Sequence, residues 1–320
     1  MNQPRTLDEA AAAVLDNGAE LRAGGTDTTA RRRGGVTRSA SVQIPLLPAL
    51  HGITRQADGT TRIGALTGVA EISAAPGLQA DYPALTKTAG ALATPQIRTA
   101  GTLGGNLLQH NRCWYYRNPH FSCYRDGGEG CPARTGIHLH AAVIDQGPCI
   151  APNPSSIAIA LLSYDARIDV HELGTLSVAD LYGDGSDPTR DHLLAPEQIL
   201  TAVTLPAPLP GERAAYNRAI SRAKAEWPLV EAVARVTVSD DVVTAVAVAA
   251  GGIAHTPLRL PEVEDALLGR EPTPENLLTA ATATAATERC SPLPQTRYKV
   301  ELLRDTVLDV LEKAVGAETT

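Results

Sequence analysis

Apolar side chains recur at helical spacing near the start of the chain and again near its end. Residues 7–18 place Leu7, Val14 and Leu15 on one face and finish at Asn17-Gly18, a common helix stop. Comparable spacing predicts further helices beginning at 69–73 and covering 83–92, 261–268, 274–288 and 299–314. Short apolar runs predict strands at 21–23, 42–44, 61–63, 166–170, 199–205, 233–238 and 242–250. The mixture predicts an α+β protein.

The length of the chain predicts more than one folding unit. At 320 residues it exceeds what a single hydrophobic core usually organises. Three prolines between 206 and 211 are typical of a linker. We therefore expect one domain at 1–208 and a smaller α+β domain at 209–320.

Charge and hydropathy exclude two classes of partner. A net charge of -7 describes an acidic surface, which argues against nucleic acid as the main partner. No apolar run approaches the roughly 18–20 residues that cross a bilayer. We expect a cytoplasmic protein that binds neither nucleic acid nor membrane.

Two glycine-rich turns offer bare backbone N–H groups to an anion. The first is Ala23-Gly24-Gly25-Thr26-Asp27, and the second is Gly101-Thr102-Leu103-Gly104-Gly105-Asn106. Neither matches the classical dinucleotide or phosphate-loop signatures. Each turn could be a plain tight turn, but a pair with adjacent hydroxyl groups can clamp one diphosphate from two sides.

Four of the five cysteines fall within 37 residues, in a segment from 111 to 150 that lacks a folding pattern. Such a long irregular segment needs something besides apolar packing to order it, and a metal centre would supply that order. The spacing of Cys113, Cys123, Cys131 and Cys149 fits neither tight zinc pairs nor the bacterial ferredoxin run. Metal ligands and free thiols both remain open at this point.

The chain resembles a known family over nearly its whole length. The two turns, with Gln96-Ile97-Arg98 before the second, look like the paired FAD-binding signatures of flavin subunits in the xanthine dehydrogenase and carbon monoxide dehydrogenase family. Ordered matches follow at 63–67, 194–200, 251–259 and 292–299. The resemblance implies a two-lobed FAD-binding domain of the vanillyl-alcohol-oxidase-like type, with lobes at about 1–52 and 53–208, and a C-terminal domain that covers the flavin.

Carried over residue by residue, the family pattern implies a set of positions that contact FAD. These are Ala23, Gly24, Gly25, Thr26, Asp27, Thr102, Gly104, Gly105, Asn106, Ser155, Leu200 and Arg218. Two positions depart from the family: Ser156 replaces an acidic residue, and Arg218 stands where relatives carry lysine near the flavin ring. We expect Arg218 to keep the positive charge that tunes the flavin, and we find no other candidate catalytic side chain.

A subset of the family, typified by the flavin subunits of 4-hydroxybenzoyl-CoA reductase and a bacterial aldehyde oxidoreductase, inserts a loop with four cysteines for a 4Fe-4S cluster. The stretch from Asn111 to Arg117 resembles that loop, so the implied ligands are Cys113, Cys123, Cys131 and Cys149. Cys149 is the least secure, and His138 or His140 is the alternative ligand.

The resemblance implies an oxidoreductase subunit that passes electrons between iron-sulfur clusters and an external acceptor or donor through FAD. Its implied partners are a molybdenum-cofactor subunit and a 2Fe-2S subunit, in a heterotrimer or its dimer. One alternative is a stand-alone flavoenzyme acting on a small molecule, and another is a non-catalytic assembly module. The sequence discloses neither the organic substrate nor the final electron acceptor.

Overall fold

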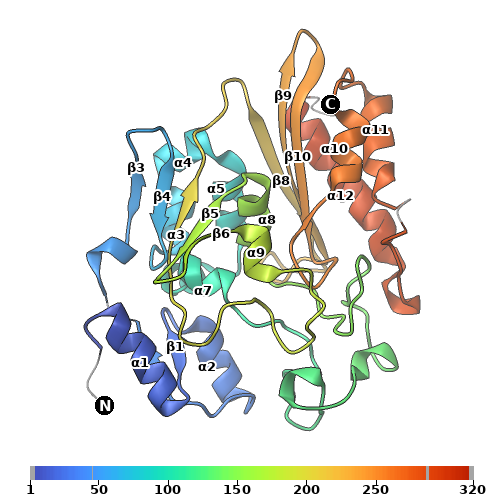
Figure 1. The fold of residues 1–320 in the computed structure, drawn as a ribbon. Coiled ribbons are helices and arrows are strands. Elements are labelled where there is room, and N and C mark those ends of the chain that lie inside the picture. The colour runs from blue at the N-terminus through green and yellow to red at the C-terminus, as the bar shows by residue number, and fades with distance from the viewer. Residues whose placement is uncertain (1–3, 45, 286–287, 317–320) are drawn as a thin grey trace.

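The computed structural model describes residues 4–44, 46–285 and 288–316. Within these ranges the chain forms three β-sheets, and helices separate or cover them (Figure 1). The N-terminal lobe lies at one side, the five-stranded sheet is central, and the four-stranded sheet with its helices lies at the other side (Figure 1). The α+β expectation agrees with this arrangement.

The N-terminal lobe contains α1 (Leu7–Asn17), β1 (Glu20–Arg22), α2 (Thr26–Arg33) and β2 (Ser41–Gln43). Helix α1 begins where the Thr6 hydroxyl accepts the N–H of Glu9 and ends at Gly18, whose φ of 55° favours glycine. Strands β1 and β2 pair in parallel, and the apolar face of α1 packs beside them through Ala10 and Val14.

The central sheet has the antiparallel order β3-β4-β7-β5-β6. Its strands are β3 (Ile53–Arg55), β4 (Thr61–Gly64), β5 (Arg167–Val170), β6 (Gly174–Ser177) and β7 (Leu200–Leu205). The accompanying helices are η1 (Pro48–Leu50), α3 (Val69–Ala74), α4 (Pro76–Asp81), α5 (Pro83–Ala91), α6 (Pro95–Ala100), α7 (Leu103–Leu107), α8 (Ser156–Ser163) and α9 (Val178–Tyr182).

Helix α8 is mostly apolar and is buried on nearly all of its surface, as expected of a helix in the interior. It contacts α5 and also strands β9 and β10 of the neighbouring sheet. It begins six residues after the cysteine-bearing segment ends at 150, so this buried helix helps to fix where that segment rejoins the core.

The C-terminal sheet has the antiparallel order β11-β10-β9-β8. It comprises β8 (Arg213–Ala219), β9 (Val230–Ser239), β10 (Val242–Gly251) and β11 (Leu258–Arg259). Helices α10 (Pro261–Leu267), α11 (Pro274–Ala283) and α12 (Tyr298–Val315), with the short η4 (Pro294–Thr296), complete a second hydrophobic core on this sheet.

Segment 111–150 is irregular, as the sequence predicts, with only two short 3-10 turns, η2 (Tyr124–Asp126) and η3 (Pro132–Arg134), among its residues. Its own apolar core is small and centres on Ala133, Ala141 and Ile150. The segment extends below the central sheet toward the start of α12 (Figure 1). Polar contacts to other elements, described below, anchor it.

Most predicted elements lie within three residues of those observed. Two differ: the second glycine turn contains helix α7, and α11 ends at Ala283 instead of 288. The hydroxyl of buried Thr284 bonds the Ala281 carbonyl, an alternative to helix continuation. Residues 286–287 of that predicted helix, and the chain ends at 1–3 and 317–320, lie outside the described residues.

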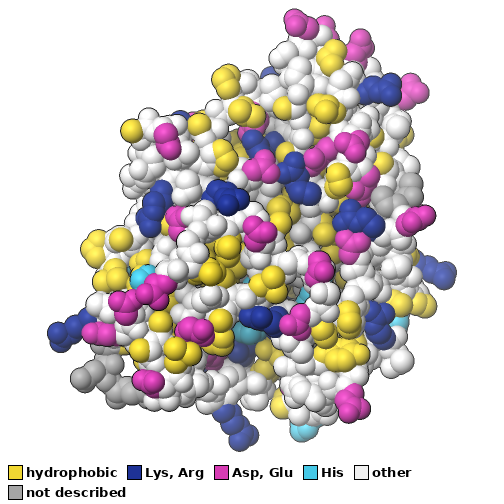
Figure 2. Space-filling view, viewed as in Figure 1, with side chains coloured by type: hydrophobic (Ala, Val, Ile, Leu, Met, Phe, Trp, Pro, Cys, Tyr) yellow, Lys and Arg dark blue, Asp and Glu magenta, His cyan; other side chains and the backbone are white. Residues whose placement is uncertain are grey.

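The surface carries mixed charge. Figure 2 shows acidic and basic side chains interspersed over one face, with apolar side chains between them. Among the described residues, no helix combines the length and apolar character that crossing a membrane requires.

Candidate functional site

The two predicted glycine turns, far apart in the sequence, lie against each other. A Cβ atom on Gly24 would sit 1.7 Å from the carbonyl oxygen of Ala100, just before the second turn. Gly25 adopts a φ of 72°, which glycine accepts without strain, and it starts helix α2. The sequence therefore places glycine where the two backbones meet and where the chain must turn.

Each turn leads into the start of a helix. Helix α2 has no side-chain cap, which leaves the N–H groups of its first turn for a ligand. Helix α7 is capped by Thr102, whose hydroxyl accepts the N–H of Gly105 at 3.2 Å. The N–H groups of Leu103 and Gly104 bond the carbonyls of Thr67 and Ala65, so the first turn offers the backbone donors and the second turn adds the Thr102 hydroxyl.

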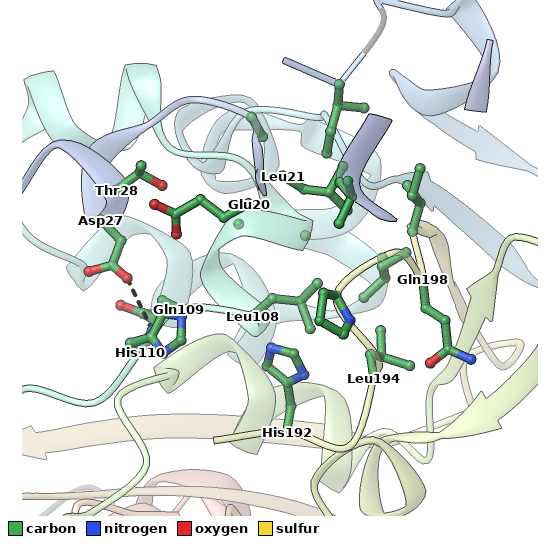
Figure 3. A pocket seen from close by; sticks show the side chains of 18 of the residues that line it. Glu20, Leu21, Asp27, Thr28, Leu108, Gln109, His110, His192, Leu194 and Gln198 are labelled. Carbon is green, nitrogen blue, oxygen red and sulfur yellow. Dashed lines mark hydrogen bonds between the residues drawn. The ribbon is translucent and has the colours of Figure 1, made fainter. Parts of the chain in front are cut away.

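That space, the turn cavity, has a volume of about 800 Å³, within the range of small-molecule and cofactor sites. Besides the turns, its lining includes residues 189–192 and 194–200, and Figure 3 shows His192, Leu194 and Gln198 among them. Nine of the predicted cofactor residues line it: Ala23, Gly24, Gly25, Thr26, Asp27, Thr102, Gly104, Gly105 and Leu200.

The other three predicted cofactor residues do not line the turn cavity. Ser155 and Asn106 contact each other, because the serine hydroxyl donates to Asn106 Oδ1 at 2.7 Å. Ser155 also caps α8 by accepting the N–H of Ala158. The Arg218 guanidinium donates to the carbonyls of Ala91, Lys224 and Glu226, so its contacts in this structure hold backbone segments together.

The side chain of Asp27 points from the first turn to the cysteine-bearing segment. Its carboxylate accepts from Arg112 at 2.6 Å, from Arg117 at 2.9 Å and from the N–H of His110 at 3.1 Å; the last contact is drawn in Figure 3. Burial opposes ionisation, but the two guanidinium groups outweigh it and lower the Asp27 pKa. Asp27 thus joins the turn cavity to the cysteine segment electrostatically.

A second carboxylate, Asp191, joins the same two regions. It accepts from Asn111 Nδ2 at 3.0 Å, contacts His110 Nδ1 at 3.0 Å, and pairs with Arg125. Only 4 % of the Asp191 side chain is exposed. Burial opposes its ionisation, yet the His110 hydrogen bond and the Arg125 charge hold its pKa well below the usual range.

Arg125, Asp191 and His192 are site residues that sequence reasoning missed. His192 lines the turn cavity and its buried Nδ1 has no hydrogen-bond partner among the described residues. Burial lowers its pKa to about 4, so the ring is neutral near pH 7 and can hydrogen-bond a ligand. The polar run at 190–192, directly before the apolar match at 194–200, was the available signal.

All four clustered cysteines line one small cavity, which we call the cysteine cavity. Its other lining residues include Tyr116, Arg125 and Ala151. The four thiols come from positions spread over segment 111–150, and none of them is in a disulfide. The tertiary fold therefore brings together the four residues that the spacing alone left ambiguous.

The arrangement is wider than a site for one metal ion. No three of these four sulfur atoms, all in described residues, lie within 4.8 Å of one another. A tetrahedral zinc site with Zn–S bonds of about 2.3 Å would bring its sulfurs to roughly 3.8 Å apart. The four sulfur atoms are therefore not arranged as the ligands of one tetrahedral zinc ion.

Cys149 lies beside a buried imidazole. His255 lies beside it and places Nδ1 2.7 Å from the Ala151 carbonyl and Nε2 3.0 Å from the Arg190 carbonyl. Carbonyl oxygens only accept, so both ring nitrogens carry protons. Although burial opposes both charges, the attraction between the imidazolium and the adjacent thiolate raises the His255 pKa to about 9 and lowers the Cys149 pKa.

The two histidines considered as alternative ligands lie elsewhere. His138 contacts the carbonyls of Ala133 and Gly136 through Nδ1 and accepts the N–H of Gln295 through Nε2. His140 packs edge-on against Trp114, with ring centres 5.3 Å apart. Neither lines the cysteine cavity, whereas Cys149 does.

Two larger cavities flank the cysteine cavity. Arg125 lines both it and the turn cavity. On another side, Cys113 and Tyr115 line both it and a cavity of about 380 Å³ bounded by Trp114 and Trp227. The four cysteines thus lie next to the turn cavity.

Comparisons with known proteins identify relatives over the whole chain. A family described as the FAD binding domain in molybdopterin dehydrogenase matches residues 1–208, and the CO dehydrogenase flavoprotein C-terminal domain matches residues 214–317. The chain is similar to the aldehyde oxidoreductase FAD-binding subunit PaoB of Escherichia coli K12, with 33 % identity over 265 residues, or 80 % of this chain and 79 % of that protein.

More distant relatives share the fold. The carbon monoxide dehydrogenase medium chain of Hydrogenophaga pseudoflava is 25 % identical over 317 residues, covering 98 % of this chain and 94 % of that protein. A solved carbon monoxide dehydrogenase structure from that organism matches with a TM-score of 0.76 at 22 % identity, over 100 % of both chains. The predicted two-domain FAD-binding fold is confirmed by these matches.

Proposed function

This chain belongs to the FAD-binding subunits of the xanthine dehydrogenase and carbon monoxide dehydrogenase family, and from that premise we propose that it is the electron-transfer subunit of a molybdenum-dependent oxidoreductase, carrying both FAD and a 4Fe-4S cluster. The observation that carries the proposal is the position of the cysteine cavity beside the turn cavity, with Arg125 lining both.

The turn cavity is the proposed FAD site. Its volume and its backbone donors suit a dinucleotide whose diphosphate lies between the two turns. Thr26 and Thr102 add hydroxyl groups there, and Leu200 supplies an apolar surface. We retain Asn106, Ser155 and Arg218 as proposed FAD residues that act from the edge of the site, through the contacts described above.

The four clustered cysteines are the proposed ligands of the 4Fe-4S cluster. Four sulfur donors fit its preference for thiolates, and the imidazolium of His255 favours the thiolate form of Cys149. When bound, FAD supplies two-electron chemistry and the cluster supplies one-electron chemistry. The residues of this chain would hold the two groups near each other, with Cys123 and Cys149 buried.

The proposed partners are a molybdenum-cofactor subunit and a 2Fe-2S subunit. The cysteine-bearing segment exposes four large apolar side chains: Trp114, Phe121, Ile137 and Leu139. Proteins without a partner rarely expose that much apolar surface in one region, so these side chains support a protein contact there. Domains at 1–208 and 209–320, the lobe boundary near 52, and a cytoplasmic location that keeps thiols reduced belong to the same proposal.

The proposal is tested on full-length protein purified without oxygen, by visible spectroscopy with iron and flavin quantified. We expect one FAD and four irons per chain. Serine variants of Cys113, Cys123, Cys131 and Cys149 should each lose iron but keep FAD. Cys290→Ser is the matched control, because Cys290 lies outside the cysteine cavity and should keep the full iron content.

Two results would contradict parts of the proposal. Wild-type protein with flavin bands but no iron removes the cluster and leaves the FAD site. Iron without flavin indicates a structural module instead of an electron-transfer subunit. Co-purification with a molybdenum-containing subunit tests the partners, and turnover of a small substrate by the lone chain would contradict them.

A further inference from the structure

Arg125 is the residue that lines both the turn cavity and the cysteine cavity. It belongs to η2, two residues after Cys123, and only 4 % of its side chain is exposed. A guanidinium is always charged in proteins, so burying it here requires compensating partners.

Those partners satisfy only one of the three guanidinium nitrogens. Nη2 pairs with the Asp191 carboxylate and lies 3.3 Å from His110 Nδ1. Nε and Nη1 are buried and have no hydrogen-bond partner among the described residues. Buried donors are almost always paired in native proteins, so two unpaired N–H groups on one buried cation call for an acceptor that the protein alone does not supply.

The surroundings indicate the direction of that acceptor. Asp191 holds Nη2 of the guanidinium, and the Tyr116 ring lies 5.2 Å from its central carbon. Tyr116 and the four thiols line the same cavity as Arg125. The turn cavity is wide enough to hydrate any group that faces it, whereas Nε and Nη1 are buried from water. The narrow cavity of the four thiols is therefore the side on which we look for an acceptor for either nitrogen.

We propose that Arg125 donates a hydrogen bond from Nε or Nη1 to a sulfur atom of the cluster and thereby raises the reduction potential of that cluster. The inference rests on the proposed 4Fe-4S site. A cluster held by four thiolates is anionic and gains a further negative charge on reduction, so a fixed cation with N–H donors stabilises the reduced form more. Asp191 and Tyr116 act on the cluster only by positioning Arg125.

The test compares the full-length protein with Arg125→Gln, which removes the charge, and Arg125→Lys, which keeps the charge but loses the Nε and Nη1 donors. Arg134→Gln is the matched control, because Arg134 is exposed in the same segment and donates to the Gly147 and Pro148 carbonyls. The cluster potential is measured by anaerobic redox titration followed by electron paramagnetic resonance. Pulsed resonance on ¹⁵N-arginine-labelled protein detects a guanidinium nitrogen coupled to the reduced cluster.

We expect wild type to show the ¹⁵N coupling. Arg125→Gln should make reduction of the cluster about tenfold less favourable, which is about 59 mV for one electron. Arg125→Lys should fall between the two, and Arg134→Gln should match wild type. The ¹⁵N coupling should be absent in both Arg125 variants.

Two outcomes overturn the inference while leaving the proposed function intact. One is iron-loaded wild type without a guanidinium coupling, a result that requires no variant to fold. The other is an Arg125→Gln protein with weaker FAD binding and an unchanged cluster potential, which would assign the unpaired donors to the flavin. Wild type without iron is a different result, because it contradicts the 4Fe-4S proposal itself.

Discussion

Replacing Gly24 by alanine tests whether the close contact of the two glycine turns creates the FAD site. The new Cβ would lie 1.7 Å from the Ala100 carbonyl oxygen and 2.8 Å from its carbon, both backbone atoms. Ordinary contact begins at 3.4 Å, so the two turns must separate by about 1.7 Å. Backbone atoms cannot move aside as the end of a long side chain can.

The separation is large compared with the tolerance of a hydrogen bond. A donor at 2.9 Å from a phosphate oxygen no longer bonds it after a shift of that size. Losing two charge-assisted bonds of about 1.5 kcal/mol or more each weakens FAD binding by at least about 100-fold. The overpacked contact should also lower the free energy of unfolding by about 1–3 kcal/mol.

The assay measures flavin content of purified protein and FAD affinity of the flavin-free form, by quenching of flavin fluorescence. Gly77→Ala is the control: Gly77 lies in helix α4, has nothing within 4 Å of its added Cβ, and should bind FAD as wild type does. If Gly24→Ala is folded and binds FAD within threefold of wild type, the contact between the turns does not form the site.

Three further predictions concern the anchors around the site. Asp27→Asn leaves Arg112 and Arg117 without their carboxylate, so urea unfolding near pH 7 should show a free energy of unfolding lower by about 3 kcal/mol. Because the Asp27 pKa is lowered in the folded protein, this difference between wild type and variant should shrink below about pH 4. An equal difference at pH 3 would contradict the ion-pair account. Ser155→Ala removes the hydroxyl that caps helix α8 at the N–H of Ala158, so the free energy of unfolding should fall by about 1 kcal/mol. Ser155→Thr keeps the hydroxyl and should lower it less. Burial lowers the Lys299 pKa to about 7 while its Nζ donates to the His140 and Gly252 carbonyls. Because the unfolded chain holds that proton up to about pH 10.4, the free energy of unfolding relative to Lys299→Met should rise above pH 7 by at most about 1.4 kcal/mol per pH unit. Parallel curves of unfolding free energy against pH for the two proteins would refute a neutral buried lysine.

The sequence determined those features that depend on local pattern or on an ordered set of motifs. Helical periodicity located α1 and α12, and apolar runs located β9 and β10 within a few residues. Glycine at positions 24 and 25 was readable as a turn, because only a residue without a side chain permits so close a backbone approach. The ordered motifs were enough to indicate the family, which the comparisons confirm.

Other elements were not predicted from the sequence because their local patterns were weak. Strand β8 carries charged and small residues, so its alternation is faint, yet pairing with β9 stabilises it as a strand. Helix α7 contains two glycines, which disfavour helix in isolation, but the Thr102 cap and burial of Leu103 and Leu107 stabilise it. In both cases tertiary contacts outweigh intrinsic preference.

Only the tertiary structure decided which residues of the site meet. Spacing along the chain left Cys149 less secure than the other three cysteines, and the fold places it with them beside His255, more than a hundred residues away. Likewise, Asp191 and Arg125 are 66 residues apart, and nothing in either local sequence predicts their ion pair. Side-chain periodicity records which face a residue takes within its own element, whereas contacts between elements depend on how whole sheets and helices pack, and that information is distributed over the entire chain.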